Sequence, residues 1–148
     1  MNTSRRECLA LGAAALLQVR PAHGTPEALR AAIIAFAAGK PVLEGTGRIT
    51  LDIATLVENG NTVPITVNVQ SPMTAADHVS TIALFNERNP QHEVAMFQLG
   101  PRAGRAVVAT RMRLATSQTI VAMARMSDGS CWQQSVDVIV TLAACIEG

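Results

Sequence analysis

The 148-residue chain has few aromatic residues, with three Phe, one Trp and no Tyr, or 3% of the sequence. Proteins that hold single-stranded nucleic acid by base stacking need aromatic side chains on their surface, so this composition argues against such a platform. Lys and Arg number 12 and Asp and Glu 11, which gives a net charge of +1. The basic residues form no stripe along the chain, so neither nucleic acid nor an acidic membrane surface is an expected partner.

The sequence also lacks the patterns that hold metals and cofactors. His23, His78 and His92 are scattered, whereas a structural zinc site needs about four ligands at paired spacings. There is no phosphate-binding glycine loop and no nucleotide fingerprint. Ser135 and Asp137 share one face of a predicted strand, but no His can be placed against them, so we interpret them as solvated strand residues. The sequence predicts no metal, no cofactor and no enzyme active site.

The first 24 residues have the pattern of a signal peptide. Arg5 and Arg6 precede an apolar run that is shorter than the roughly 20 residues needed to span a bilayer. Adjacent arginines before a modestly apolar run indicate the twin-arginine export route. Small residues around Gly24 suggest cleavage there, so residues 1–24 are predicted to be a twin-arginine-type signal and Thr25 the mature start. The protein is therefore expected in the periplasm, without a membrane span; the alternative is an N-terminal helix that lies on the membrane.

Hydrophobic residues make up 49% of the chain and charged residues 16%, which is enough apolar material for one folded domain. A helical lead-in is predicted over 25–46. Thr25 can cap a helix, Pro26 suits its first turn, and Gly39 with Pro41 ends it.

From residue 47 the apolar residues alternate, which indicates half-buried strands. Pro64 has no amide hydrogen, so its strand should begin at an edge or turn that side to solvent. In the last run one predicted face is apolar, with Ile139 on the other face as an exception. The apolar face consists of Trp132, Val136, Val138, Val140 and Leu142. Several short strands with frequent turn signals predict an all-β sandwich or barrel over 47–142, with a flexible C-terminal arm over 143–148. The predicted strands are 49–53, 63–70, 79–86, 93–99, 105–114, 118–126 and 131–142.

Two cysteines, Cys131 and Cys145, remain after removal of the signal. If most of the path between them is strand, they stand roughly 46 Å apart, and a disulfide needs Cα atoms within about 7 Å. We therefore expect no intrachain bond. Cys131 is interpreted as a small buried hydrophobe. Cys145 lies in a terminal segment, where exposure is common, and is a candidate for covalent attachment of a group. Two alternatives stay open: an intermolecular disulfide in a structural protein, and a thiol enzyme such as a peroxidase or hydrolase.

Several segments together resemble the SoxY family of sulfur-oxidation carrier proteins, from Gly47 to the C-terminus. The twin-arginine-like leader and the short helical lead-in are also typical of that family. The matching segments are Ile49–Ile53, Glu58–Pro64, Ser71–Thr74, Phe85, Asn89-Pro90, Thr110–Ala115 and Met126–Ser130.

The resemblance implies an immunoglobulin-like β-sandwich with a short N-terminal helix, paired with a SoxZ-like subunit. It implies that thiosulfate-derived sulfur intermediates travel covalently on the C-terminal cysteine, here Cys145. A c-type cytochrome enzyme would load this thiol, and a metal-dependent sulfate thiohydrolase would release sulfate from it. The carrier itself would be no enzyme and would hold no metal or haem. A related carrier for a different sulfur compound is a further alternative.

The arm departs from the family pattern, which is Gly-Gly-Cys-Gly-Gly. Here Ala143 and Ala144 precede the cysteine, and Ile146 and Glu147 follow it. Alanine is stiffer than glycine and Ile146 is β-branched, so the arm should adopt fewer conformations. The Glu147 carboxylate should raise the pKa of the thiol and repel anions. We therefore expect weaker or altered loading with thiosulfate.

Overall fold

The computed structural model describes residues 23–143, beginning with the predicted helix, α1 (Pro26–Ala37). The Thr25 hydroxyl caps it by accepting a hydrogen bond from the Ala28 amide at 3.2 Å, and Pro26 occupies its first turn. The helix ends where Ala38 adopts a left-handed conformation with φ of 50°. The start of the helix is as predicted, and its end lies close to the predicted Gly39, with Ala38 as the left-handed cap residue.

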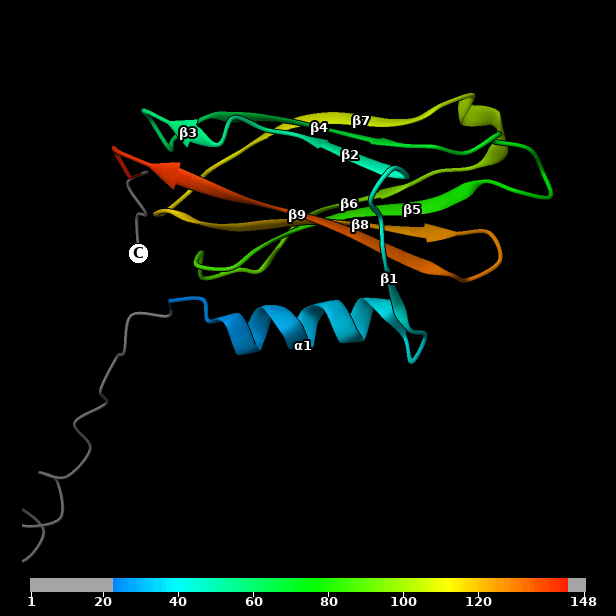
Figure 1. Ribbon diagram of the computed structural model, residues 1–148, viewed down its shortest axis with the longest axis horizontal. Coiled ribbons are helices and arrows are strands. Elements are labelled where there is room, and N and C mark those ends of the chain that lie inside the picture. Colours follow the sequence, from blue (N-terminus) through cyan, green and yellow to red (C-terminus); the bar gives the residue numbers. More distant parts are fainter. Residues whose placement is uncertain (1–22, 144–148) are drawn as a thin grey trace, which may run out of the picture.

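The strands form two stacked sheets, with α1 on the outside of the larger one (Figure 1). The smaller sheet has the order β2 (Ile49–Asp52), β4 (Val63–Val69), β7 (Ala106–Met112). The larger sheet has the order β1 (Val42–Glu44), β9 (Cys131–Val140), β8 (Gln118–Met126), β5 (Val79–Asn86), β6 (Glu93–Gln98), and β3 (Leu56–Val57) also pairs with β9. A 3-10 turn, η1 (Pro101–Ala103), joins β6 to β7.

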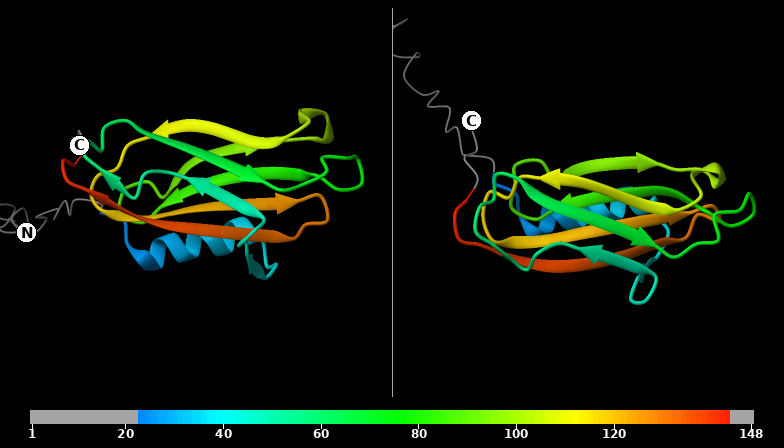
Figure 2. Two further views of the ribbon diagram at one scale, coloured as in Figure 1. Left: turned by 45° about the horizontal axis from the view of Figure 1, so that its top comes forward. Right: turned by 90° about the horizontal axis from the view of Figure 1, so that it is seen from above.

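The central strands of the larger sheet, β5 and β8, are buried on both faces, between the smaller sheet and α1 (Figure 2). Ile82 and Leu84 point into the core between the sheets, whereas Ala83 and Phe85 point toward α1. The rings of Phe85 and Phe36 meet edge to face, with centroids 6.0 Å apart. Burial on both sides explains why β5 and β8 are nearly continuous apolar runs rather than alternating ones.

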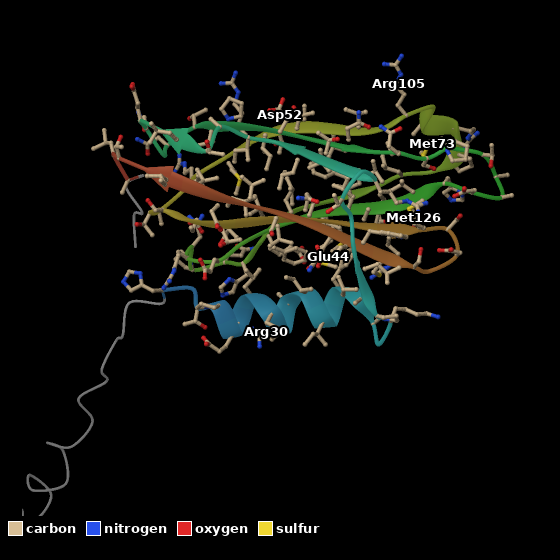
Figure 3. All side chains as sticks on the ribbon, viewed as in Figure 1. Arg30, Glu44, Asp52, Met73, Arg105 and Met126 are labelled. Carbon is tan, nitrogen blue, oxygen red and sulfur yellow. The ribbon has the colours of Figure 1, made fainter. Side chains whose placement is uncertain are left out.

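The smaller sheet buries one face only. Residues 63, 65, 67 and 69 of β4 are buried and the residues between them are more exposed, which is the expected alternation. Asp52 and Arg105 lie on its outward side, Arg30 lies on the far side of α1, and the buried Met73 and Met126 belong to the core between the sheets (Figure 3).

The predicted all-β sandwich with a short N-terminal helix is confirmed, and each predicted strand is present to within two residues at its ends. Pro64 lies where β4 has no partner on one side, because the ladder with β2 covers only Thr66–Val69. Two short strands, β1 and β3, were not predicted. They have three and two residues, too few for a period to show, and they form by parallel pairing with β9.

One prediction about the last strand was wrong. Leu142 was expected to continue β9 and face the core, but the strand ends at Val140 and the Leu142 side chain is 62% exposed. The backbone at Leu142 bonds to the loop after β3 instead of to a strand of the larger sheet. The inward side of β9 is otherwise as predicted, since Trp132, Val136 and Val138 pack in the core between the sheets.

Candidate functional site

Cys145 lies outside the described residues, so the candidate site is defined by the part of the fold that leads to it, the end of β9. Here the chain bonds to the last residue of β3 and to the loop that follows it. The Thr141 amide donates to the Val57 carbonyl at 3.0 Å, and the Leu142 amide donates to the Glu58 carbonyl at 3.2 Å. The Leu142 carbonyl in turn accepts from the Gly60 amide at 2.9 Å. Both backbone groups of Leu142 are therefore held by one short loop.

That loop is fixed to the rest of the sandwich. The Asn59 side chain accepts from the Asn61 amide at 2.9 Å, which closes a tight turn. The buried Gly60 carbonyl accepts from the amide of Leu114 at 2.8 Å, and the Leu114 side chain is completely buried. Through Gly60, Leu142 is thus connected to the segment after β7. The bonds join the end of the larger sheet to the end of the smaller one.

Ser117 holds the end of β9 from the other side. Its hydroxyl accepts from the Val140 amide at 2.9 Å and lies 3.4 Å from the Val140 carbonyl. The Thr141 hydroxyl donates to the Glu58 carbonyl at 3.3 Å. Because these bonds act on three consecutive residues, the chain reaches Ala143 from a fixed position at one end of the sandwich.

The position of Ala143 limits where the Cys145 thiol can act. The Cα atoms of Ala143 and Cys145 are two residue steps apart, and an extended chain advances at most about 3.6 Å per step, or about 7 Å in all. With its own side chain, the sulfur stays within about 10 Å of the Ala143 Cα. Any partner that reacts with this thiol must therefore come close to the end of β9.

Three large apolar side chains are exposed at this end. Leu56 in β3 is 60% exposed, Ile139 in β9 is 59% exposed, and Leu142 is the third. We call these three residues the arm-base patch. One signal for it is visible in the sequence, because Ile139 interrupts the alternation of β9. The roles of Leu56 and of Gly60 were missed, since they depend on pairing between distant segments.

Cys131 behaves as predicted. Its side chain is fully buried beneath α1, in a cluster with Ala83, Phe85 and Met123. It begins a continuous strand whose other end, Val140, lies about 30 Å away at 3.3 Å per residue. The five residue steps from Val140 to Cys145 span at most about 18 Å, so the Cα atoms of Cys131 and Cys145 stay farther apart than the roughly 7 Å that a disulfide allows.

We therefore predict that Cys145 is a reactive thiol and Cys131 a protected one. Iodoacetamide should modify Cys145 readily in the native state. Without denaturant, alkylation of Cys131 should be at least about 100-fold slower than that of Cys145, and denaturant should remove the difference. Peptide mass mapping after timed alkylation measures both rates. A peptide pair joined through Cys131 and Cys145 in a non-reducing digest would contradict the strand geometry.

The other residues singled out from the sequence have local partners. The Nδ1 atoms of His78 and His92 lie 3.0 and 2.9 Å from the carbonyls of Thr74 and Asn86. Ser135 is exposed, and the Asp137 carboxylate accepts from the Thr119 hydroxyl at 2.7 Å.

Within residues 23–143 no three His, Cys, Asp or Glu side chains gather as a metal site would require. In the same range no helix has the length and apolar character needed to cross a membrane.

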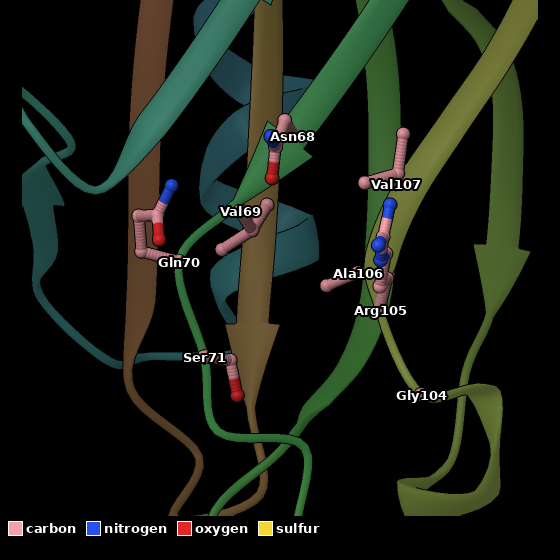
Figure 4. Close-up of a pocket in the computed structure, with 8 residues that line it drawn as sticks. All are labelled: Asn68, Val69, Gln70, Ser71, Gly104, Arg105, Ala106 and Val107. Carbon is pink, nitrogen blue, oxygen red and sulfur yellow. The ribbon is translucent and has the colours of Figure 1, made fainter.

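A shallow pocket of about 270 Å³ lies on the smaller sheet, between the ends of β4 and β7 (Figure 4). Asn68, Gln70, Arg105 and Val107 are among the residues that line it. It lies at the end of β4 away from Gly60, about 20 Å along the strand at 3.3 Å per residue. This distance separates it from the end of β9, so it is not part of the candidate site.

Comparison with known proteins gives the family. The model of the sulfur oxidation protein SoxY matches residues 33–145. The chain belongs to the SoxY family. Its structure is similar to that of the sulfur carrier protein SoxY from Chlorobium limicola f thiosulfatophilum, with a TM-score of 0.65 and 30% identity, over 77% of this chain and 96% of that chain. A comparison with curated proteins gave no match.

More distant structures share the fold alone. A superoxide reductase (neelaredoxin) from Ignicoccus hospitalis matches with a TM-score of 0.57 and 16% identity, over 79% of this chain and 94% of that chain. A superoxide reductase from Nanoarchaeum equitans matches with a TM-score of 0.51 and 12% identity, over 62% and 91%. Membership of the SoxY family establishes an immunoglobulin-like β-sandwich and a carrier role in sulfur oxidation, with the chemistry done by separate enzymes.

Proposed function

We propose that this SoxY protein carries thiosulfate-derived sulfur intermediates covalently on Cys145. The observation that carries the proposal is the extent of the family match, which runs to residue 145 and so includes this cysteine. The fold is consistent with the role, because the chain leaves the sandwich at Ala143 from a position fixed by Glu58 and Gly60. The other cysteine of the mature chain, Cys131, is buried beneath α1 and is inaccessible to an enzyme.

The proposed loading step is an oxidation. The Cys145 thiol loses its proton, its sulfur forms a bond to the outer sulfur of thiosulfate, and two electrons leave to the haem groups of a c-type cytochrome enzyme. The product is the S-thiosulfonate, Cys-S-S-SO₃⁻. Among the residues that hold the end of β9, Glu58 is the ionisable one, and it contacts that segment through its backbone carbonyl. Proton removal is therefore not assigned to Glu58.

The proposed release step is a hydrolysis. Water attacks the terminal sulfur, its S–S bond breaks, and HSO₄⁻ leaves while Cys145 keeps a persulfide, Cys-S-SH. This step needs no oxidant, and a metal-dependent sulfate thiohydrolase would carry it out. Other enzymes of the system would then oxidise the remaining sulfur.

We further propose that the protein works in the periplasm as a heterodimer with a SoxZ-like subunit. The twin-arginine pattern of residues 1–24 supports export, and the family supports a partner from the same sulfur-oxidation system. The twin-arginine route exports folded proteins, so the carrier could bring a partner subunit that has no signal of its own.

The intact mass of the mature protein, purified with its native partner and measured with and without a thiol reductant, tests the proposal. We expect a reducible sulfur-containing adduct that peptide mapping places on Cys145, with Cys131 unmodified. The mass of the adduct identifies the cargo, so a different sulfur compound would be recognised at once. A Cys145 joined to another chain by a disulfide would contradict the proposal and support a structural role.

A further inference from the structure

We propose that the arm-base patch, formed by Leu56, Ile139 and Leu142, is the surface on which the enzymes that act on Cys145 dock. The enzyme surface expected to cover the patch is apolar and surrounds the opening of the channel that leads to the active site. This inference rests on the proposed function, because it assumes that enzymes come to Cys145, but it concerns described residues.

The patch is built on the fixed end of the sandwich. Leu56 and Ile139 are register partners in the parallel pairing of β3 with β9, so their side chains project from the same face. Leu142 follows three residues after Ile139 and is bonded on both sides to the loop after β3. The backbone positions of the three residues are therefore set before any partner arrives, which limits the entropy lost on binding.

The exposure of these side chains indicates contact with a protein. Each of the three shows about three-fifths of its surface to solvent, although isoleucine and leucine are stabilised by burial, by about 25 cal/mol for each Å². Single exposed apolar residues are ordinary, but three that gather at the base of a reactive arm are the pattern of an interaction site. Elsewhere in residues 23–143, Val107 on β7 is an exposed strand residue of similar character, and it lies in the distant pocket.

The short reach of the arm makes the contact necessary. The thiol stays within about 10 Å of the Ala143 Cα. An enzyme that surrounds this thiol with its reacting groups must place its channel opening around residues 143 and 144. The surface next to that opening then lies against Leu142 and its neighbours. An apolar rim there would exclude water and bury the patch, whereas a charged rim would lose hydration without gaining a partner.

The short reach of the arm also implies that two enzymes cannot bind the carrier at the same time. Because each must cover the arm-base patch to reach Cys145, the loading and hydrolytic enzymes are expected to compete for one surface. The carrier must then dissociate between steps. Affinity for each enzyme should accordingly be modest, as a small patch of three side chains provides.

The test uses the carrier purified with its SoxZ-like subunit and carrying Cys145→Ser, so that binding is measured without chemistry. The double variant Leu56→Thr with Ile139→Thr removes apolar surface and places threonine, a β-branched residue that suits strands, at both positions. We expect it to weaken binding of the c-type cytochrome enzyme about tenfold, which is the size of effect seen for contact residues near the centre of an interface. Val107→Thr is the matched control, because it makes the same kind of change on an exposed strand far from the arm, and it should leave affinity unchanged.

Three outcomes would overturn the inference. Equal affinity for the double variant and Val107→Thr would show that the patch does not contact the enzyme. Loss of the SoxZ-like subunit from the double variant would assign the patch to that interface. Enhanced alkylation of Cys145 by iodoacetamide in the double variant carrying the native cysteine would assign the patch to the chain's own arm, with Ile146 as its occupant.

Failure of the docking surface and failure of the proposed function can be told apart. If Cys145 carries no sulfur adduct in the intact-mass measurement, the carrier proposal fails whatever the patch does. If the adduct is present and the double variant binds normally, the carrier proposal stands and the docking inference fails. Unchanged circular dichroism and unchanged association with the SoxZ-like subunit establish that the variant is folded.

Discussion

Replacing Cys145 with Ser is expected to abolish loading of sulfur compounds entirely. Serine has nearly the same size, but its hydroxyl is not ionised near neutral pH and cannot form the sulfur–sulfur bond that loading requires. Incubation with thiosulfate and the c-type cytochrome enzyme, followed by intact-mass analysis, should show no mass increase in Cys145→Ser. Under the proposed function, electron transfer to the haem of that enzyme should stop as well.

Cys131→Ser is the control for this experiment. Because Cys131 is fully buried in the cluster beneath α1, its replacement should lower the free energy of unfolding by about 1–2 kcal/mol but leave the loading rate unchanged. Loading that persists in Cys145→Ser and disappears in Cys131→Ser would reverse the assignment of the two cysteines.

Restoring the family's glycines is expected to speed loading with thiosulfate about tenfold, a factor that corresponds to about 1.4 kcal/mol in the barrier. The variant replaces Ala143, Ala144, Ile146 and Glu147 with Gly. Glycine widens the range of backbone angles open to the arm and removes the side chain of Ile146, which an enzyme channel would have to accommodate. Removal of Glu147 takes one negative charge away from the thiol and from the incoming anion. The loading rate is measured by the rise of the adduct mass over time.

Two single variants separate the causes. Glu147→Gln removes the charge and keeps the shape, so its benefit should shrink as salt is added, because mobile ions screen exposed charges. Ile146→Gly removes bulk and keeps the charge, and its benefit should be independent of salt. Equal rates for the native arm and the restored Gly-Gly-Cys-Gly-Gly arm would refute the prediction and indicate that the partners of this protein have adapted to its arm.

The fixed end of β9 gives these substitutions their importance. The backbone amides of Thr141 and Leu142 are bonded to Val57 at the end of β3 and to Glu58 after it, so the sandwich adds no conformational freedom to the arm. Under the proposed function, whatever freedom the thiol needs to enter an enzyme must come from residues 143–148. Because the arm is short, a change of one side chain there alters a large fraction of the conformations open to it. In a longer arm the same change would have a smaller relative effect, because more residues would contribute conformational freedom.

The sequence by itself determined the local elements and the family. Thr25 and Pro26 specify the start of α1 through groups within one turn, and alternating apolar residues specify the long strands, because both signals are local. The strand prediction was also enough to separate Cys131 from Cys145, since the length of an extended chain depends on residue number alone.

Only the tertiary structure decided how the end of β9 is held. β3 has two residues and no period of its own, and it exists because it pairs in parallel with Ile139 and Val140. The contacts of Gly60 with Leu142 and Leu114 join segments that are more than 50 residues apart. Such contacts depend on which distant backbone groups remain unpaired when the sheets stack, and no local pattern encodes that. The arm-base patch follows from the same pairing, because β3 places Leu56 beside Ile139 where the sandwich ends and nothing in the described fold covers them.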